Sequence, residues 1–156
     1  VRASYIRHLQ ARFDAGHPAA PLPGVEALLE ACRARTAWTL GLVTGNFPES
    51  GAMKLQAAGL ALEQFTVQAW GDEGLSRNHL PAKALQMHAN SDPLRTVVIG
   101  DTLADIECGR ANGCSVIAVA TGACTRAQLE CGQPDLLLDD LADTGTVMSW
   151  LERMAA

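Results

Sequence analysis

The sequence lacks the features that mark several classes of protein. It has no apolar run near the roughly 20 residues that span a bilayer, and its longest such runs are residues 38–43 and 115–120. It has no repeat and no long run of like charges, and 48% of its 156 residues are hydrophobic, which excludes disorder. Basic residues are outnumbered, with 12 Lys and Arg against 17 Asp and Glu, so we expect no nucleic-acid or membrane partner.

Paired cysteines are missing as well. The five cysteines are an odd number without a C-x-x-C spacing, which fits a reducing cytoplasm better than a disulfide framework. The four histidines do not stand at the short paired spacings that a zinc site needs. We therefore expect a cytoplasmic chain whose thiols act mainly as small buried apolar groups.

Short apolar segments alternate with segments of helical periodicity along the chain. The expected strands are residues 38–43, 65–70, 96–100, 115–120 and 136–138, and the expected helices are residues 2–13, 24–35, 49–58, 81–89, 104–111 and 140–154. This alternation predicts an α/β fold in which helices cover both faces of a parallel sheet. In such sheets the chemistry lies at the carboxyl ends of the strands.

Two carboxylates follow the strand expected at residues 96–100. Asp101 stands at its tip, and a helix that starts nearby brings Asp105 within one turn of it. Clustered carboxylates of this kind suit Mg²⁺, which prefers one or two of them together with water and substrate phosphate. The alternative is structural: Asp101 or Thr102 caps the helix, and Asp105 favours its positive end.

A polar turn also follows the strand expected at residues 38–43. It consists of Thr44, Gly45 and Asn46, which offer a hydroxyl and backbone N–H groups to an anion. An ordinary connection between a strand and a helix is the alternative explanation.

The order and spacing of three motifs carry more information than each motif alone. The motifs are LVTGN at residues 42–46, RNHLP at residues 77–81 and VIGDTLAD at residues 98–105. In this order the chain resembles the haloacid-dehalogenase-like hydrolases, particularly their phosphoglycolate-phosphatase-like branch, over about residues 20–153. The resemblance implies a Rossmann-like sheet and Mg²⁺-dependent hydrolysis of a small phosphate ester through an aspartyl-phosphate.

The resemblance also implies roles for individual residues. Thr44 would hold the transferring phosphoryl group, with Gly45 and Asn46 completing its binding turn. Asp101 would ligate Mg²⁺, and Asp105 would support the same acidic cluster.

A basic residue is expected to neutralise the phosphate, and the family usually has Lys there. Arg77 stands at the best-matching position, with a planar guanidinium in place of a point charge. Lys83 is the alternative for this position, whereas Lys54 is expected to be only a surface charge.

One family motif is absent from the 156 residues: the Asp-x-Asp-Gly-Thr turn that carries the nucleophile at the end of the first strand. The resemblance therefore implies a truncated chain. Residues 1–20 would be a remnant of the helical cap with a linker, and residues 21–156 the core without its central first strand. We expect such a chain to be inactive by itself, and to bind Mg²⁺ weakly or not at all.

The missing strand would lie between the strands that end at Thr44 and Asp101, and its loss would expose two apolar strand edges. Either these strands pair directly, or another chain or the amino-terminal segment fills the gap. The alternative function is a non-enzymatic paralogue that acts as a binding or dimerisation module, with a homodimer formed through the exposed edges. A dinucleotide-binding domain is disfavoured because the G-x-G-x-x-G turn is missing.

Overall fold

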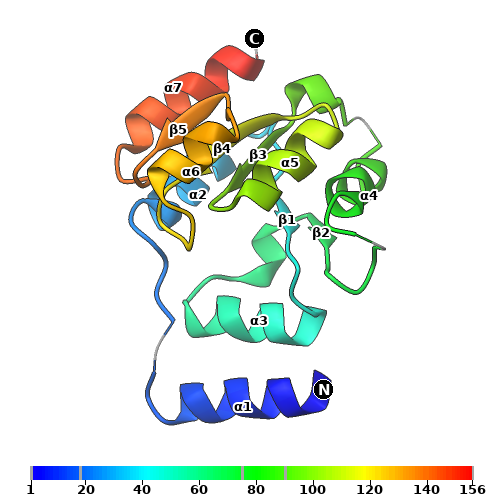
Figure 1. Ribbon diagram of the computed structural model, residues 1–156, viewed down its shortest axis with the longest axis vertical. Helices are drawn as coiled ribbons and strands as arrows, with labels where there is room; N and C mark the ends of the chain where they lie inside the picture. The colour runs from blue at the N-terminus through cyan, green and yellow to red at the C-terminus, as the bar shows by residue number, and fades with distance from the viewer. Residues whose placement is uncertain (1, 18, 75, 90, 156) are drawn as a thin grey trace.

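The computed structural model describes residues 2–17, 19–74, 76–89 and 91–155. Helices and strands alternate along most of the chain (Figure 1). The strands are β1 (Gly41–Val43), β2 (Val67–Ala69), β3 (Val97–Gly100), β4 (Ser115–Val119) and β5 (Leu136–Leu138). The helices are α1 (Arg2–Asp14), α2 (Val25–Arg33), α3 (Pro48–Ala57), α4 (His79–Met87), α5 (Leu103–Ala111), α6 (Arg126–Cys131) and α7 (Thr144–Ala155), with 3₁₀ turns at Leu62–Gln64 and Pro93–Arg95. The predicted α/β class is confirmed.

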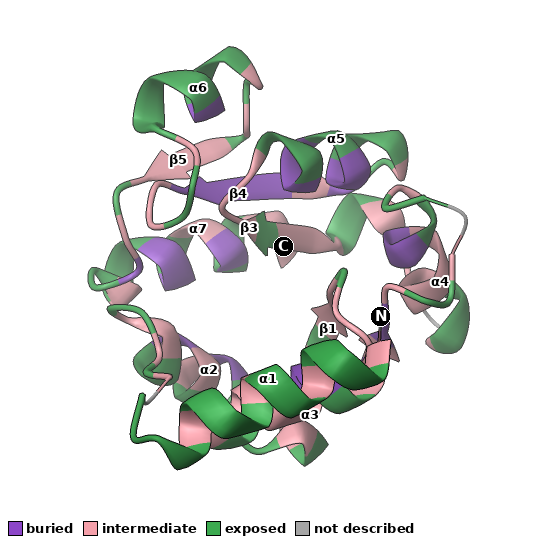
Figure 2. Cartoon of the chain, turned by 60° about the horizontal axis from the view of Figure 1, so that its bottom comes forward, coloured by how far each residue is buried: buried purple, intermediate pink, exposed green. Residues whose placement is uncertain are grey.

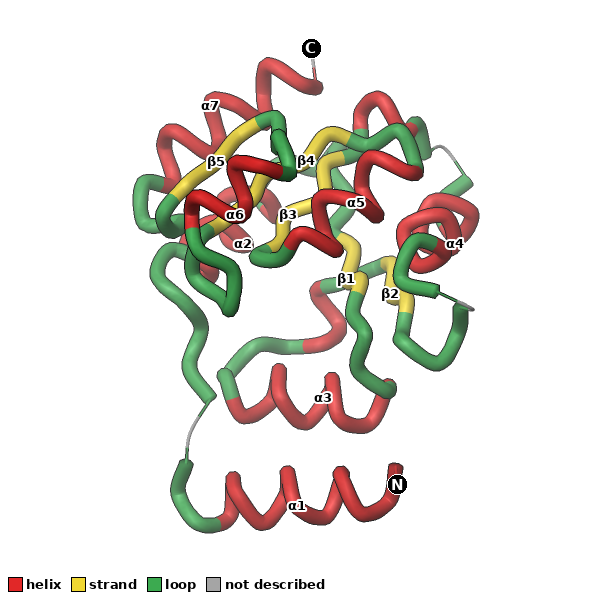
Figure 3. The backbone as a smooth tube through the Cα atoms, viewed as in Figure 1, coloured by secondary structure: helices red, strands yellow, loops and turns green. Residues whose placement is uncertain are grey.

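The strands form two separate parallel sheets. One pairs β1 with β2, and the other has the order β3-β4-β5 (Figure 3). Val43 stands opposite Ala69 in the first sheet, and Gly100 stands opposite Ala118 in the second. Among the described residues β1 and β3 do not pair, so the expectation that they would pair directly is wrong.

The first helix, α1, lies alongside α3 at one end of the molecule (Figure 1). Its Arg2 donates hydrogen bonds to Glu49 at 2.6 Å and to Asp72 at 2.9 Å, and its guanidinium lies 4.5 Å from the centroid of the Phe47 ring. Because most of its residues are polar and none of them is buried, α1 stays a surface helix. The expectation that the amino-terminal segment fills the gap in the sheet is therefore also wrong for the described residues.

The core is built on the two faces of β4. Ile117 and Val119 pack with α2 and α7 on one face, and Val116 and Ala118 pack with α5 and α6 on the other. Figure 2 shows β4 buried along most of its length between these helical layers, as expected for a parallel sheet, and only Ser115 is partly exposed. None of the described helices is long and apolar enough to cross a membrane.

Several boundaries differ from the prediction for local reasons. The helix expected at residues 140–154 begins only at Thr144, because the carboxylate of Asp143 accepts hydrogen bonds from Thr146 N and Oγ1 at 3.1 and 2.6 Å and caps it. The short helix α6 was not predicted, although Thr125 and Gln128 form a reciprocal capping box at its start. Strands β1 and β2 are three residues each and shorter than expected.

Candidate functional site

The turn after β1 presents a threonine hydroxyl. Thr44 N donates to Ala69 O at 3.0 Å, which ties the start of the turn to β2. Thr44 Oγ1 accepts hydrogen bonds from Asn46 N at 3.2 Å and from Asn46 Nδ2 at 2.7 Å. Since a hydroxyl has two acceptor lone pairs and one proton, this arrangement leaves the Thr44 proton to be donated elsewhere.

Glycine at two positions lets this turn pack closely. Gly71 N donates to Asn46 O at 2.9 Å, and a Cβ at Gly71 would clash with the carbonyl of Gly45. The turns after β1 and β2 are thereby held together. A Cβ at Gly51 would likewise clash with the ring of Trp70, which is only 7% exposed, so Trp70 has a packing role.

Lys54 of α3 contacts this turn, so the expectation that it is only a surface charge is wrong. Its Nζ donates to Asn46 Oδ1 at 2.7 Å and lies 5.8 Å from the centroid of the Tyr5 ring. A chain of hydrogen bonds thus runs from the ammonium of Lys54 through the Asn46 amide to the Thr44 hydroxyl. The only sequence signal for this role is the position of Lys54 in α3, the helix that follows the turn directly.

The turn after β3 is held together by Asp105. Its Oδ2 accepts hydrogen bonds from Asp101 N at 3.1 Å, Thr102 N at 3.0 Å and Thr102 Oγ1 at 2.7 Å. Its Oδ1 accepts a hydrogen bond from Arg77 Nη2. The Asp105 side chain is only 11% exposed. Both carboxylate oxygens are therefore engaged, and the capping alternative describes Asp105 well.

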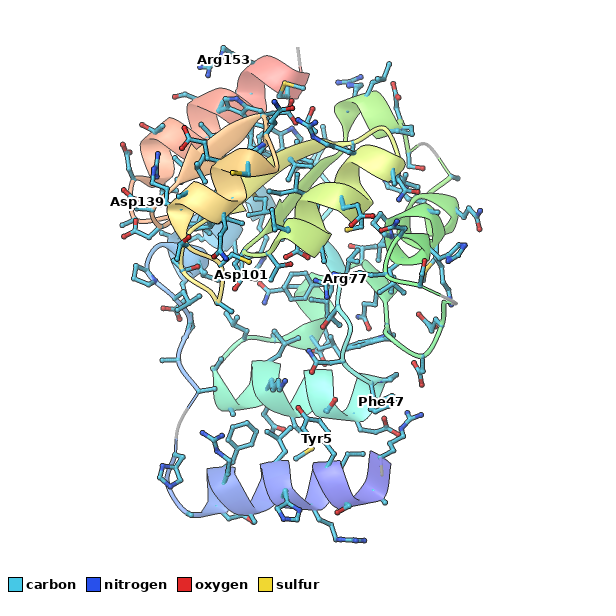
Figure 4. The ribbon with its side chains drawn as sticks, in the orientation of Figure 1. Tyr5, Phe47, Arg77, Asp101, Asp139 and Arg153 are labelled. Carbon is cyan, nitrogen blue, oxygen red and sulfur yellow. The ribbon has the colours of Figure 1, made fainter. Side chains whose placement is uncertain are left out.

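Arg77 lies between the two turns. It is paired with Asp105 in the first turn of α5, and a Cβ added to Gly45 in the turn after β1 would lie 3.4 Å from Arg77 Nη1. Figure 4 shows Arg77 between these elements. Partial burial lowers the pKa of Arg77, but the hydrogen bond and the charge of Asp105 outweigh burial and raise the pKa above its ordinary value. The guanidinium therefore stays charged at any physiological pH.

Lys83, the alternative to Arg77, is engaged elsewhere. Its Nζ lies 2.8 Å from Glu73 Oε1, and Glu73 Oε2 accepts a hydrogen bond from Trp70 N at 2.8 Å. The hydrogen bond from Lys83 lowers the pKa of Glu73. Lys83 thus braces the loop after β2, and the structure brings Arg77 rather than Lys83 to the acidic turn.

Asp101 is the remaining acidic residue of the site. Its carboxylate lies directly against Gly122, where any Cβ would clash with it, and borders a cavity of about 150 Å³ together with Thr121. The described parts of the chain contain no group of three or more Asp, Glu, His or Cys side chains placed to hold a metal ion. Because Asp105 is fully engaged, Asp101 offers one available carboxylate, and a magnesium site here would need water and substrate phosphate to complete it.

Comparisons with known proteins point to one family. The sequence model of the HAD-hydrolase-like family matches residues 76–144. A search of curated proteins found no match.

Several solved structures share the fold. A hydrolase from Pseudomonas syringae is 20% identical with a TM-score of 0.76, and the alignment covers 96% of this chain and 70% of that one. A predicted phosphoglycolate phosphatase from Haemophilus somnus is 24% identical with a TM-score of 0.71, covering 81% of this chain and 56% of that one. CbbY from Rhodobacter sphaeroides, solved with xylulose-(1,5)bisphosphate, is 27% identical with a TM-score of 0.70, covering 81% and 56%.

The fold is an α/β core with polar turns at the carboxyl ends of β1 and β3. With the matching family model, these features confirm the resemblance to the haloacid-dehalogenase-like hydrolases. The chain spans less than three fifths of the length of the Haemophilus and Rhodobacter structures.

Proposed function

We propose that the chain is the core of a phosphatase-type hydrolase that binds the phosphoryl group of a small phosphate ester. The phosphoryl group would lie between the turn at Thr44, Gly45 and Asn46 and the guanidinium of Arg77. One observation carries this proposal: Arg77 meets both the Gly45 turn and the Asp105 turn, so a hydroxyl donor and a cation converge where β1 and β3 end. CbbY, which shares the fold, was solved with phosphate and with xylulose-(1,5)bisphosphate.

The donors suit a phosphoryl oxygen. The Thr44 proton is not needed within its own turn, because Asn46 supplies both hydrogen bonds that the hydroxyl accepts. Arg77 uses Nη2 for Asp105 and keeps Nη1 near Gly45, where it is free to donate a charge-assisted hydrogen bond. Asp105 positions Arg77, and Lys54 adds a second positive charge behind Asn46.

Catalysis needs more than this chain provides. The reaction that the resemblance implies begins with an aspartate nucleophile, and Asp101 and Asp105 do not supply one: Asp105 is fully hydrogen-bonded and Asp101 is the candidate metal ligand. Of the described residues in the two turns, Asp101 would hold Mg²⁺, and the metal would offset negative charge on the phosphoryl group. The chain by itself is therefore proposed to be inactive as a phosphatase.

Phosphate binding tests the site. Titration with inorganic phosphate, followed by backbone amide NMR, is expected to shift the amides of residues 44–46, and Thr44→Val or Arg77→Gln should weaken binding about tenfold, the effect of one charge-assisted hydrogen bond. Thr36→Val, in the loop before β1, and Arg153→Gln, at the far end of α7 (Figure 4), are matched controls that should bind as the parent does. Equal binding by all four variants would contradict the proposal.

Inactivity has its own test. The purified chain with Mg²⁺ should release no phosphate from p-nitrophenyl phosphate. Release that disappears in Asp101→Ala would show that the assigned site is active and that the proposed inactivity is wrong.

A second candidate function, a non-enzymatic binding role, is favoured by a separate observation. Among the described residues, β1 and β3 each have a strand partner on one edge only, and the open edges could bind another chain.

A further inference from the structure

Arg77 stands in a mostly exposed loop between β2 and α4. Within the described part of this loop, Asp72, Glu73, Ser76 and Arg77 itself are exposed residues. The core therefore does not fix the backbone here, and a long arginine side chain on such a loop has many accessible directions. Because the proposed phosphate site needs the guanidinium at one place, other contacts must hold this segment.

One face of α5 supplies these contacts. Asp105, Cys108 and Asn112 follow one another at spacings of three and four residues, which place side chains on the same face of an α-helix. The carboxylate of Asp105 pairs with the guanidinium of Arg77. The amide of Asn112 donates from Nδ2 at 2.8 Å to the backbone carbonyl of Asn78, the residue directly after Arg77. At roughly 1.5 Å per residue, these two contacts are about 10 Å apart along the helix axis.

The Asn112 amide uses both of its hydrogens. Its Nδ2 donates to Cys108 O as well as to Asn78 O, each at 2.8 Å. A side-chain amide has two N–H hydrogens, and only a donor fits between two carbonyl oxygens, which sets the orientation of the amide. The bond to Cys108 fixes the amide on its own helix, so the bond to Asn78 holds the loop at a defined distance from α5.

The end of α5 holds Asn112 in place in turn. Asn112 N donates to Gly109 O at 3.1 Å, and Gly113 follows in the left-handed conformation at φ 72°, which ends the helix. A Cβ at Gly109 would clash with the side chain of Val116, so this part of α5 lies directly against the buried strand β4. The Asn112 amide is therefore attached to the best-packed part of the molecule.

The backbone of Asn78 is coupled closely to that of Arg77. His79 N donates to Ser76 O and Leu80 N donates to Arg77 O, both at 3.1 Å. These two overlapping turns lead into α4, which lies beside α5 (Figure 1). A contact that fixes Asn78 O therefore also fixes the point from which the Arg77 side chain starts.

We propose that Asn112 is a positioning residue for Arg77. It holds the backbone next to Arg77 at the carboxyl end of α5, while Asp105 holds the guanidinium at the amino end, so that the side chain is directed to the Gly45 turn. The proposal rests on the proposed function, because it is at the phosphate site that this direction matters. The alternative is a purely structural role, in which Asn112 caps α5 and joins it to α4 without affecting Arg77.

Phosphate affinity is the first test. Asn112→Ala should weaken binding of inorganic phosphate about threefold, less than Arg77→Gln, because the charge stays but the hydrogen bond that directs it is lost. Gln68→Ala is the matched control: Gln68 is also a half-buried amide, and its Nε2 donates to two backbone carbonyls, Leu62 O at 3.4 Å and Phe65 O at 3.1 Å. Gln68→Ala should bind as the parent does. Binding unchanged in Asn112→Ala, or reduced equally in both variants, would overturn the proposal.

A double-mutant cycle separates positioning from a structural role. If Asn112 acts through Arg77, Asn112→Ala should cause no further loss of phosphate affinity in a chain that already carries Arg77→Gln. Losses that simply multiply in the double variant would mean that Asn112 acts independently of Arg77, and the proposal would be wrong.

The side chain of Arg77 gives a readout that needs no phosphate. In the parent chain the heteronuclear NOE of the Arg77 Nε–H group should be high, and that of exposed Arg153 should be low. Asn112→Ala should lower the Arg77 value towards that of Arg153, whereas Gln68→Ala should not. An unchanged Arg77 value in Asn112→Ala would overturn the positioning role even if the parent binds phosphate. If the parent binds none, the proposed function fails, and this measurement alone decides on Asn112.

A second variant covers the case in which Asn112→Ala does not fold. Asn112→Asp keeps the shape of the side chain, but its carboxylate has no hydrogen to donate at neutral pH. We expect the same loss of phosphate affinity and the same fall in the Arg77 NOE. Parent-like values of both in the folded Asn112→Asp chain would contradict the proposal.

Discussion

The two sheets of this molecule differ in how completely they are built. In the β3-β4-β5 sheet, Val116, Ile117 and Ala118 of the central strand are fully buried. In the β1-β2 sheet, Gly41 is exposed, and Leu42 and Val43 are only half-buried. A parallel strand becomes stable when it has a partner on each edge and a helix on each face. Strand β4 has strand partners on both edges and helices on both faces, whereas β1 has a strand partner on one edge only among the described residues.

Polar contacts join the β1-β2 sheet and its helix α4 to the β3-β4-β5 sheet and its helix α5. Arg77 pairs with Asp105 across them, and Asn112 Nδ2 donates to Asn78 O at 2.8 Å. Helix α4 packs on β1 and β2 and also contacts α5. The β3-β4-β5 sheet therefore contributes most of the core, while the site that we propose for phosphate depends on how the β1-β2 sheet is held against it.

The largest expected effect compares the central strand and the open edge of the β3-β4-β5 sheet with the same substitution. Ile117 in β4 is fully buried, and Ile99 at the open edge of β3 is 40% exposed. Ile117→Ala should lower the free energy of unfolding by about 3 kcal/mol, because it leaves a cavity in a closed core. Ile99→Ala should cost about 1 kcal/mol or less, because its removed atoms are partly hydrated. Urea unfolding measures both values, and equal costs would contradict the comparison.

Loss of the Arg77–Asp105 contact should have the next largest effect on the free energy of unfolding. Asp105→Ala removes the hydrogen bonds to Asp101 N and Thr102 as well as the partner of Arg77, and we expect a loss of about 2 kcal/mol in unfolding free energy. Asp139→Ala is the matched control. The Asp139 side chain is 81% exposed in its ion pair with Arg126, and such pairs contribute about 0.5 kcal/mol or less. If Asp139→Ala lowers the free energy of unfolding as much as Asp105→Ala, the Asp105 contact has no special role in stability.

A smaller effect, on phosphate binding, concerns Lys54 of α3 and Lys83 of α4. Lys54 reaches the phosphate turn through Asn46, and Lys83 is bound to Glu73. Lys54→Gln should weaken inorganic phosphate binding about threefold, since it removes a positive charge behind the turn. Lys83→Gln should leave binding unchanged. The same NMR titration measures both, and a larger effect of Lys83→Gln would place the second cation there.

The smallest expected effect uses the reactivity of cysteines. Burial raises the pKa of Cys108 in α5, and the charge of Asp105 adds to this, so little of its thiol is ionised at pH 8. Cys131 is exposed and should react first with a maleimide, and Cys108 should react slowly, faster only as the pH rises well above the ordinary thiol range. Mass spectrometry of the labelled sites gives the order, and Cys108 reacting as fast as Cys131 would contradict it.

Much of the fold was predictable from local patterns. Strand β5 lies at the predicted residues, and α3 is followed by Gly59 in the left-handed conformation at φ 73°, which favours glycine after the end of a helix. Strand ends were less predictable, because a short apolar run such as residues 38–43 does not specify how many of its residues find a partner. Helix α6 is only six residues long, and its apolar periodicity was too brief to notice.

The sequence by itself determined the order of the elements and the placement of Thr44 and Asp101 at strand ends, because hydrophobic periodicity and turn residues act within a few positions. Only the tertiary structure decided that Arg77 rather than Lys83 reaches the acidic turn. It also decided that Lys54 donates a hydrogen bond to Asn46 and that both carboxylate oxygens of Asp105 accept hydrogen bonds. It also decided that β1 and β3 stay apart. Each of these outcomes depends on contacts between residues distant in sequence, or on the full hydrogen-bond count of one carboxylate, and local patterns carry no information about either.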